Sequence, residues 1–403
     1  MPDRTNLTRR GFLKTAAVAA AVPMFVNSKA FGANDRITMG AIGLGGRGTG
    51  DMGGFLGRSN VQVVAVCDVV GSHMKRAKDK VDGKYKSKDC KQYVDFREIT
   101  GRDDIETVMI GTPDHWHAAI SIEAMKNGKD VFCEKPETLT VRQGRAMVDI
   151  ARRYGRVFCG GSQRVWGDYN WFHKMVQGGA IGEVKEAWVN VWGPSGPCLL
   201  PPVKKPDDVN WDLWLGPAPQ RPFHPNLIRG GFRPYRDYSG GGMTDWGCHT
   251  FGGALFCLGL HMTGPQTITP PDGKDVKLLT FEFANGVKIY HDMKGPRMAY
   301  KGSEGKIPGP KGTRKKTPPN IHIPNYKGSG GLLGDFLHCV RTREKPFRDI
   351  EPAHRAATFC HLGNIAYWLK RPLKWDPVKE EIIGDKEAAR WLDREPREPY
   401  GLW

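Results

Sequence analysis

The chain has 403 residues, of which 39% are hydrophobic and 26% charged, a balance typical of a globular protein. This length allows two domains, or one large domain with insertions. The 51 glycines and 29 prolines predict many tight turns and long loops. The nine cysteines, an odd number without a Cys-x-x-Cys pair, argue against a disulfide framework and against a zinc cluster.

The formal net charge of +17 raises the question of a nucleic-acid partner. Much of the positive excess lies between Lys294 and Lys327, where prolines and glycines interrupt the run and only Tyr300 and Tyr326 lie nearby. A nucleic-acid surface needs a docking element or stacking aromatic residues. We therefore predict a solvated loop and no nucleic-acid partner, while attraction of anionic substrates or surfaces stays open.

Residues 1–33 have the pattern of an export signal. Arg9 and Arg10 precede an apolar run at 16–26 that is too short to span a bilayer, which takes about 20 residues. Residues 28–30, "SKA", resemble a cleavage site, and the paired arginines resemble the twin-arginine pattern. A plain secretory signal, an uncleaved tail and a membrane anchor are the alternatives. We expect export to the periplasm, with no stable membrane insertion after the signal is removed.

Strand and helix patterns alternate over the next part of the chain. Short apolar segments predict strands at 36–43, 61–68, 104–113, 129–136 and 156–161. Two segments, 116–128 and 140–155, have helical patterns that end on glycine, and Thr140 is suited to cap the second. This alternation predicts a doubly wound parallel sheet within an α/β domain over residues 34–160.

A glycine pattern follows the first of these strands directly. Gly43, Gly45 and Gly48 form G-x-G-x-x-G, and Asp68 ends the second strand at the distance that the dinucleotide fingerprint requires. Glycines let the backbone approach a pyrophosphate, and the following helix offers free N–H groups at its N-terminus. The predicted cofactor loop comprises Gly43, Leu44, Gly45, Gly46, Arg47 and Gly48. A glycine turn without a nucleotide is the alternative.

The choice between NAD and NADP depends on the end of the second strand. The Asp68 carboxylate is expected to accept hydrogen bonds from both ribose hydroxyls and to repel a 2′-phosphate, which favours NAD. Lys75 and Arg76 lie downstream and keep NADP as the less favoured alternative.

After Gln163 the alternation stops. Helices are predicted at 168–183, 330–346 and 351–372, and strands at 184–193 and 274–295. The last of these is a hairpin around Asn285-Gly286. A Pro-rich stretch at 194–225 has no period and is expected to be an ordered excursion over one face. We predict a second, α+β domain with a mostly antiparallel sheet over residues 161–403.

Three motifs, taken in order, resemble the Gfo/Idh/MocA family of glucose–fructose oxidoreductases and inositol dehydrogenases, in a bacterial branch that often carries twin-arginine signals. They are the glycine loop with Asp68, "TPDHWH" (112–117) with "EKP" (134–136), and "TDWGCHT" (244–250) after a glycine run. The resemblance covers nearly the whole chain after the signal. It implies a Rossmann domain joined to an open-faced sheet domain, an active site between them, and a homo-oligomer, either a dimer or a tetramer.

The resemblance also assigns roles to residues. Lys135, Asp245 and His249 match the family's residues for catalysis and substrate binding. The loop expected under the nicotinamide ribose contains Thr112, Pro113 and His117, and the further cofactor contacts are Glu134, Lys135 and Gln163.

Other residues near these motifs have two interpretations each. Arg164 is a candidate for binding substrate hydroxyls or for pairing with an acid. Trp116, Trp166 and Trp246 are candidates for stacking on a sugar or for core packing, and Trp116 is taken as the substrate contact. His115 belongs either to the site or to a solvent-facing loop.

The chemistry of alcohol oxidation supports the same residues. A base must remove the hydroxyl proton as hydride leaves the same carbon, and a pKa near neutral suits that base. His249 fits with its ordinary pKa of about 6.5. Asp245 is expected to orient His249 or to hold a neighbouring hydroxyl, and Lys135 to share the proton. The sequence thus predicts an NAD-dependent oxidoreductase of a sugar, glycoside or cyclitol.

Three other functions are compatible with parts of the sequence. A redox-neutral glycosidase with retained NAD would oxidise, eliminate, rehydrate and reduce, but the histidine–glycine motif associated with such enzymes is missing. A non-catalytic binding protein would not need Lys135, Asp245 and His249 together. A metal site needs three or four ligands, and Asp245 and His249 supply two, so no metal is predicted.

Overall fold

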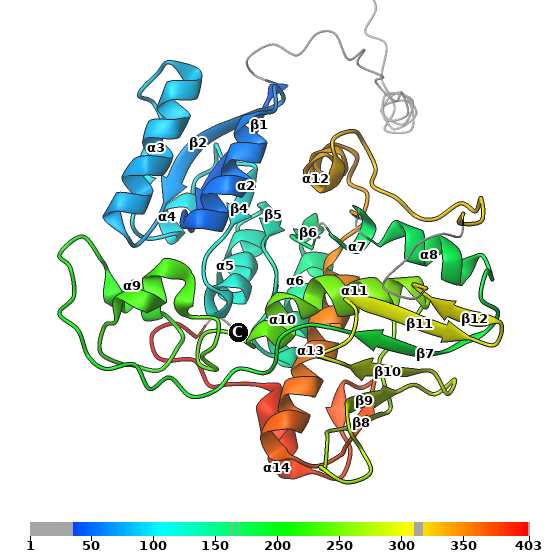
Figure 1. Cartoon of the computed structure of the whole chain (residues 1–403). Coiled ribbons are helices and arrows are strands. Elements are labelled where there is room, and N and C mark those ends of the chain that lie inside the picture. Colours follow the sequence, from blue (N-terminus) through cyan, green and yellow to red (C-terminus); the bar gives the residue numbers. More distant parts are fainter. Residues whose placement is uncertain (1–34, 163, 168, 310–316, 402–403) are drawn as a thin grey trace, which may run out of the picture. The chain divides into compact units, whose positions relative to one another are not determined.

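Two β-sheets organise the computed structural model, which describes residues 35–162, 164–167, 169–309 and 317–401 (Figure 1). One sheet has six strands in the order β3-β2-β1-β4-β5-β6, and the other has eight in the order β12-β11-β7-β10-β9-β8-β13-β14. Both sheets belong to one compact unit, Ile37–Trp403. The predicted export signal lies outside the described residues.

The six-stranded sheet is parallel throughout, which confirms the predicted doubly wound architecture. Its strands are β1 (Ile37–Ile42), β2 (Val61–Cys67), β3 (Lys91–Tyr93), β4 (Thr107–Ile110), β5 (Asp130–Cys133) and β6 (Phe158–Gly160). Its helices are α2 (Gly46–Leu56), α3 (Gly71–Tyr85), α4 (Arg97–Thr100), α5 (Asp114–Lys126) and α6 (Val141–Arg153). The sequence did not predict β3, because three polar residues show no strand pattern.

The local sequence explains the burial of the central strands and the start of α6. The central strands β4 and β5 are buried along their whole length, as expected when helices cover both faces of a parallel sheet. Thr140 caps α6 as predicted. Its side chain accepts from the backbone N–H of Gln143, whose side chain returns to the backbone of Thr140, so the two form a capping box.

The eight-stranded sheet is mostly antiparallel, as predicted, since among its described strand pairs only that of β7 with β10 is parallel. Its strands are β7 (Val184–Val189), β8 (Thr267–Thr269), β9 (Leu279–Glu282), β10 (Lys288–His291), β11 (Met298–Gly302), β12 (Gly305–Ile307), β13 (Leu373–Asp376) and β14 (Glu381–Ile382). The predicted hairpin joins β9 to β10, and Gly286 in its turn has φ +78°.

Part of the basic segment that was predicted as a solvated loop is a hairpin instead. Strands β11 and β12 pair with each other, and β11 pairs with β7. Met298 and Tyr300 point into the core while Lys301 is exposed, so the positive charge sits on the outer face of a strand. For residues 298–307 the prediction of a solvated loop was wrong, because the net charge concealed this alternation. Residues 310–316, which belong to the densest basic run, lie outside the described residues.

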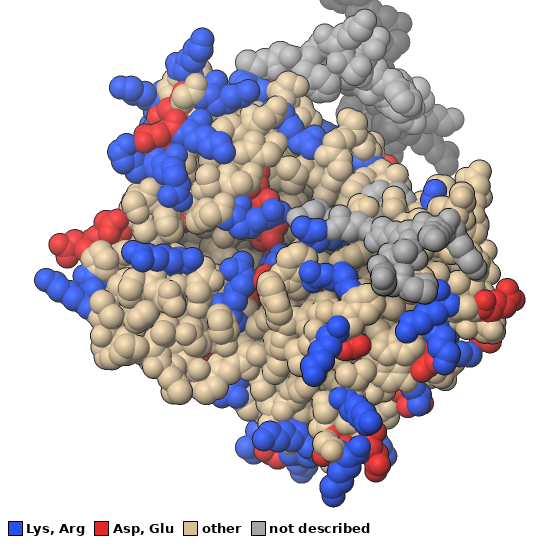
Figure 2. Space-filling model, viewed as in Figure 1, with Lys and Arg blue, Asp and Glu red and all other residues tan. Residues whose placement is uncertain are grey.

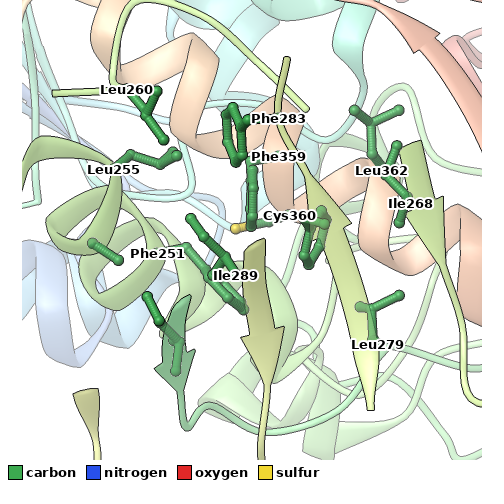
Figure 3. Close-up of a cluster of buried hydrophobic side chains, with 14 of the residues drawn as sticks. Phe251, Leu255, Leu260, Ile268, Leu279, Phe283, Ile289, Phe359, Cys360 and Leu362 are labelled. Carbon is green, nitrogen blue, oxygen red and sulfur yellow. The ribbon is translucent and has the colours of Figure 1, made fainter. Parts of the chain in front are cut away.

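Helices α8 (Asn170–Gln177), α11 (Gly247–Cys257) and α13 (Ile350–Leu369) accompany the second sheet. Their apolar side chains share one core with its strands (Figure 3). The rings of Phe281 and Phe359 stack with centroids 3.8 Å apart, and Phe251 packs against both. Among the described residues, no helix has both the length and the apolar character needed to cross a bilayer.

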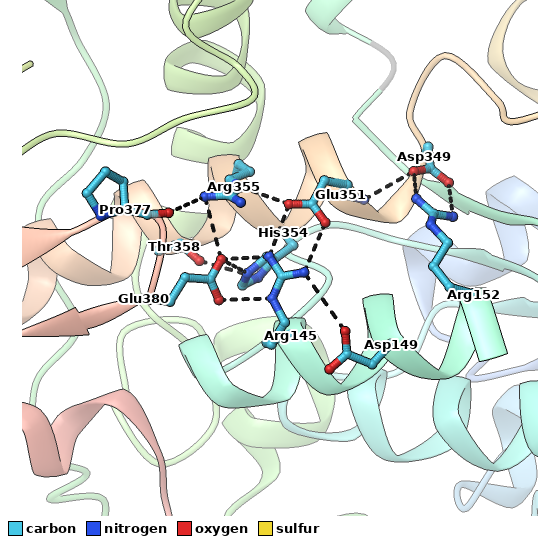
Figure 4. A network of polar contacts seen from close by, with 10 residues as sticks. All are labelled: Arg145, Asp149, Arg152, Asp349, Glu351, His354, Arg355, Thr358, Pro377 and Glu380. Carbon is cyan, nitrogen blue, oxygen red and sulfur yellow. Dashed lines mark hydrogen bonds and ion pairs between the residues drawn. The ribbon is translucent and has the colours of Figure 1, made fainter. Parts of the chain in front are cut away.

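Two helices from the second half of the chain tie the sheets together. Helix α12 (Gly331–Thr342) packs on the parallel sheet, where Phe336 contacts Phe55 and Phe132 with centroid distances of 6.0 and 5.9 Å. Helix α13 packs against α6 through the ionic network of Figure 4. There Arg145 of α6 lies 3.0 Å from Glu351 and 2.7 Å from Glu380.

The Pro-rich excursion is ordered, as predicted, and it returns to the parallel sheet. It contains α9 (Trp211–Leu215) and is followed by η2 (Leu227–Gly231). The N–H of Gly71 donates to the carbonyl of Asp208 at 2.8 Å. Trp211 and Trp214 stack at 4.7 Å within a separate hydrophobic cluster that includes Val70. The excursion therefore lies against the strand end that carries Asp68.

Candidate active site

The glycine loop is shaped by close backbone approaches. Gly43 has φ +78°, and a Cβ on Gly48 would lie 1.8 Å from the carbonyl oxygen of Gly43, so both positions require glycine. Gly45 and Gly46 face open space, where an added Cβ would meet nothing within 4 Å. Among the residues that the structure describes, no side chain caps the N-terminus of α2. The loop and this helix end thus form a cradle that suits a pyrophosphate.

Asp68 is held beside this cradle. Its carboxylate accepts from the N–H of Leu44 at 2.5 Å and from the N–H of Val70 at 2.8 Å. Arg76 is nearby, since its Nη2 donates to the carbonyl of Leu44 at 3.1 Å, whereas Lys75 pairs with exposed Asp79. Two backbone N–H groups therefore hold the carboxylate of Asp68, the residue that the sequence predicts to bind the cofactor ribose.

A cavity of about 650 Å³ runs along these residues, a size that suits a bound cofactor. One wall comes from the parallel sheet, including Gly43, Gly45, Gly46, Arg47, Asp68, Thr112, Pro113, His117, Glu134 and Lys135. The other wall comes from the excursion and the segment after it, including Leu213, Trp214, Leu227, Phe232 and Arg233. The cradle, the acid and the cavity together fit a dinucleotide.

Lys135, which follows β5, reaches the second half of the chain. Its Nζ donates to the carbonyl oxygen of Asp245 at 2.9 Å and also contacts the Asp245 carboxylate. Arg233 approaches the same carboxylate, with Nε 3.1 Å from Oδ1. Burial raises the pKa of Asp245, but the two cations outweigh it and the pKa is lowered. Asp245 is thus a carboxylate held between two positive charges.

His249 is buried next to this pair, with 4% of its surface exposed. Burial, together with the charges of Lys135 and Arg164, holds its pKa well below 6.5. The expectation of an unperturbed imidazole is therefore wrong, and His249 is neutral at pH 7. Within the described residues its Nδ1 has no hydrogen-bond partner.

Asp245 and His249 do not share one helix. Helix α10 (Gly242–Asp245) ends at the acid, and α11 begins at Gly247. Asp245 makes its ionic contacts with Lys135 and Arg233, and no hydrogen bond joins it to His249 among the described residues. The structure thus brings Asp245 to Lys135 rather than to His249.

The remaining cofactor candidates connect the loops around the cavity. The ring nitrogens of His117 lie 2.7 Å from the carbonyl oxygen of Pro136 and 2.8 Å from that of Thr112. Glu134 accepts from Arg47 at 2.8 Å, which ties the glycine loop to the Lys135 loop. Gln163 lies outside the described residues.

Trp116 and His115 both form hydrogen bonds to backbone carbonyls of α9. Trp116 is buried, donates to the carbonyl of Leu213 at 2.9 Å, and packs edge-on against Phe96 and Tyr400. Core packing therefore describes Trp116 better than sugar stacking. His115 is buried as well, with Nε2 2.9 Å from the carbonyl oxygen of Trp214, so the solvent-facing alternative is wrong.

Trp246 and Arg164 lie near His249, one of the catalytic candidates. The Trp246 ring contacts that of His249 at 5.9 Å, and the Arg164 guanidinium lies 5.1 Å from the Trp246 ring. The side chain of Trp166 is outside the described part of the chain. Of the predicted substrate contacts, the structure therefore gathers Arg164, Asp245 and His249 around Trp246.

Sequence reasoning missed two charged residues of the site. Asp114, which follows Pro113, is buried and accepts from the Ser239 hydroxyl at 2.5 Å. Burial raises the pKa of Asp114 to about 7, although Arg233 and Ser239 oppose this. The position of Asp114 inside "TPDHWH" was a usable signal, whereas Arg233 lies in a stretch without periodicity. The described residues contain no group of three metal-ligating side chains.

The fold and this site define a class: oxidoreductases with a dinucleotide-binding domain and a second α/β domain. Residues 37–161 match the family described as "Oxidoreductase family, NAD-binding Rossmann fold", and residues 170–402 match its "C-terminal alpha/beta domain". The chain therefore belongs to the Gfo/Idh/MocA oxidoreductase family.

Solved structures share the fold. An NAD-binding protein from Listeria innocua aligns with a TM-score of 0.59 and 20% identity, over 84% of this chain and 97% of its own. Myo-inositol 2-dehydrogenase from Lactobacillus plantarum aligns with a TM-score of 0.58 and 16% identity, over 84% and 99%.

Similar curated sequences match only part of the chain. A glycosyl hydrolase family 109 protein of Shewanella baltica is 31% identical over 172 residues, which is 37% of this chain and 38% of that protein. An alpha-N-acetylgalactosaminidase of Shewanella oneidensis is 33% identical over 120 residues, or 29% and 26%. The matches thus span less than half of these relatives.

Proposed function

We propose that the protein transfers hydride between NAD and a secondary hydroxyl or keto carbon of a sugar, glycoside or cyclitol. The observation that carries this proposal is the contact of Lys135 with Asp245 at the edge of the dinucleotide cavity. That contact joins the wall of a cofactor site to proton-handling groups from the second half of the chain. A pure binding protein would have no need of it.

In this proposal the side chains around Asp245 have separate roles in hydride and proton transfer. The nicotinamide supplies the hydride acceptor or donor when the cofactor is bound. Asp245 fixes the ammonium group of Lys135, which can then donate to the reacting oxygen of the substrate. Neutral His249, with a buried and unpartnered Nδ1, can accept the hydroxyl proton or hold a neighbouring hydroxyl. Arg233 keeps Asp245 ionised throughout.

Two measurements test the proposal. Mass spectrometry of the purified protein should find a bound nicotinamide nucleotide. Incubation with NAD⁺ and a panel of sugars, glycosides and cyclitols should raise the absorbance of NADH. Absence of turnover in both directions, with NAD and with NADP, would overturn the proposal.

A redox-neutral glycosidase is the second candidate, and two observations favour it. Glycosidase relatives are similar to part of the chain, and the excursion forms a second wall of the cavity, which would help to retain a cofactor. Release of an aryl leaving group without net NADH would identify this activity. Stoichiometric NADH formation would identify the dehydrogenase.

We also propose export through the twin-arginine pathway and assembly into a homo-oligomer. A reporter fused to residues 1–33 should reach the periplasm of a bacterial host only when the twin-arginine translocase is present. Replacing Arg9 and Arg10 by lysine should stop it. Light scattering of the mature chain should give the mass of a dimer or a tetramer, and a monomer would contradict the assembly.

A further inference from the structure

Trp246, which lies between Asp245 and His249 in the sequence, is surrounded by cations. The Arg164 guanidinium lies 5.1 Å from its ring and the Arg297 guanidinium 4.3 Å. Both distances are those of cation–π contacts. The charge of Arg164 also reaches His249, because it contributes to the lowered pKa of that imidazole. The positive cluster therefore adjoins the proposed catalytic groups.

A second tryptophan extends the cluster toward solvent. Trp192 follows β7 and is 66% exposed, although its ring lies edge-on to that of Trp246 at 5.9 Å. An exposed indole has an uncovered face, which is the surface that stacks on the apolar face of a sugar ring. We name Arg164, Trp192, Trp246 and Arg297 the arginine–tryptophan cluster.

Within the described residues Arg297 forms no ion pair, and its Nη1 donates weakly to the carbonyl of Asn190 at 3.5 Å. The nearby acid Asp292 directs Oδ1 to the N–H groups of Lys294 and Gly295, both at 3.1 Å. On the face of the molecule drawn in Figure 2, lysine and arginine side chains lie around a central hollow, with acidic side chains among them.

We propose that the arginine–tryptophan cluster is a subsite for an acidic carbohydrate, a hexuronic acid or its glycoside. This inference rests on the proposed function and names its substrate class. Arg297 and Arg164 would bind the carboxylate, since a guanidinium matches a carboxylate with paired hydrogen bonds. Trp192 would stack on the sugar. The neighbouring Asp245 and His249 place the reacting carbon next to the subsite.

Calorimetric titration of the NAD-loaded protein tests the subsite with matched ligands: methyl glucoside and glucuronide, galactoside and galacturonide, mannoside and mannuronide. The acidic member of at least one pair should bind at least about tenfold more tightly than its neutral partner. The difference should shrink at high salt, because the site is partly exposed.

Variants separate the charge from the ring. Arg297→Met should remove the preference for the acid, and Arg164→Met should reduce it. Trp192→Leu should weaken both members of a pair equally, because it contacts the sugar and not the charge. Arg153→Met is the matched control. Arg153 also lies over a ring, that of Tyr154 at 5.9 Å, but at the last turn of α6, away from the cavity.

Equal affinity within every pair, or a preference that survives in Arg297→Met, would overturn the subsite. NADH formation, followed in the same samples, tests the proposed function separately. Preferential binding without hydride transfer would keep the subsite and contradict the oxidoreductase assignment. Turnover of the neutral and acidic members of each pair, with equal affinity for both, would keep the oxidoreductase assignment and contradict the subsite.

Discussion

At the scale of single residues, the site is a balance of buried charges. Asp245 lies between Lys135 and Arg233, while neutral His249 lies beside them. A carboxylate held by two cations has little freedom to turn toward an imidazole. The Asp245 carboxylate is thus held on Lys135 and Arg233, and the proposed role of His249 has to be carried by the imidazole without this acid.

His249→Ala tests that position. Because the pKa of His249 lies below 6.5, the imidazole stays neutral down to acidic pH. If it takes the proton, the acidic limb of the wild-type kcat/KM profile lies below pH 6.5. The variant should lose about 100- to 1,000-fold in kcat/KM and also that limb. Full activity with an unchanged pH profile would contradict the assignment.

Asp68→Asn tests the cofactor preference. The amide keeps an acceptor for the backbone N–H groups of Leu44 and Val70 but removes the charge that repels a 2′-phosphate. The ratio of NADP to NAD affinity should rise by about tenfold or more, measured by calorimetry. Asp79→Asn, an exposed change on the same helix as Arg76, should leave the ratio unchanged. An unaltered ratio in Asp68→Asn would show that Asp68 does not face the ribose.

At the scale of elements, the periodicity of apolar residues predicted the long apolar strands and missed the short or charged ones. Long apolar runs gave β1, β2 and β5, and Thr140 marked the start of α6. Short or charged strands were missed: β3 has three residues, and the basic charges of β11 masked its alternation. The break between α10 and α11 was also missed, because the spacing of Asp245 and His249 equally suits one helix.

Two glycines of α2 make a matched test of the cofactor cradle. A Cβ on Gly48 would clash with the carbonyl of Gly43, so Gly48→Ala should open the loop and weaken NAD binding by about tenfold or more. Gly50 is exposed and an added Cβ meets nothing within 4 Å, so Gly50→Ala should raise stability by up to about 1 kcal/mol. Calorimetry and thermal melts measure both, and equal NAD affinity in the two variants would contradict the cradle.

At the scale of the whole molecule, the network of Figure 4 joins the two halves. Glu380 is buried and lies 2.9 Å from the His354 ring and 2.7 Å from Arg145. Burial would raise its pKa, but His354 and Arg145 lower it from 4.5 to about 2. The stabilisation by Glu380 is therefore present above pH 4.5 and is lost as pH falls toward 2.

Glu380→Gln should lower the free energy of unfolding by about 3 kcal/mol at pH 7, because it leaves Arg145 and His354 without that charge. Urea denaturation should show less loss of stability between pH 5 and 3 than in the wild type. Glu381→Gln changes the exposed neighbour and should alter stability by about 0.5 kcal/mol or less. Equal effects of the two variants would contradict the network's role.

The site was predictable to the extent that motifs encode it. Gly43, Asp68, Lys135, Asp245 and His249 lie in short patterns whose spacing is fixed by the elements around them. Arg233 reaches Asp245 from an irregular segment, and Arg297 reaches the Trp246 ring from a turn before β11, and no period indicates the direction of either side chain. Their positions depend on how the second sheet meets the first, which is information that only tertiary packing contains.

The second wall of the cavity bears on how long a bound nucleotide stays in the site. The segment from Leu213 to Arg233 lines the cavity and also supplies the cation that contacts Asp245. If a bound nucleotide has to displace this segment to leave, it removes that cation from Asp245 as well. Escape of the cofactor and disassembly of the proton site are then one event, so the barrier to that event sets both the residence time of the nucleotide and the lifetime of the competent site. A molecule that holds its nucleotide through many turnovers is independent of the concentration of free nucleotide around it.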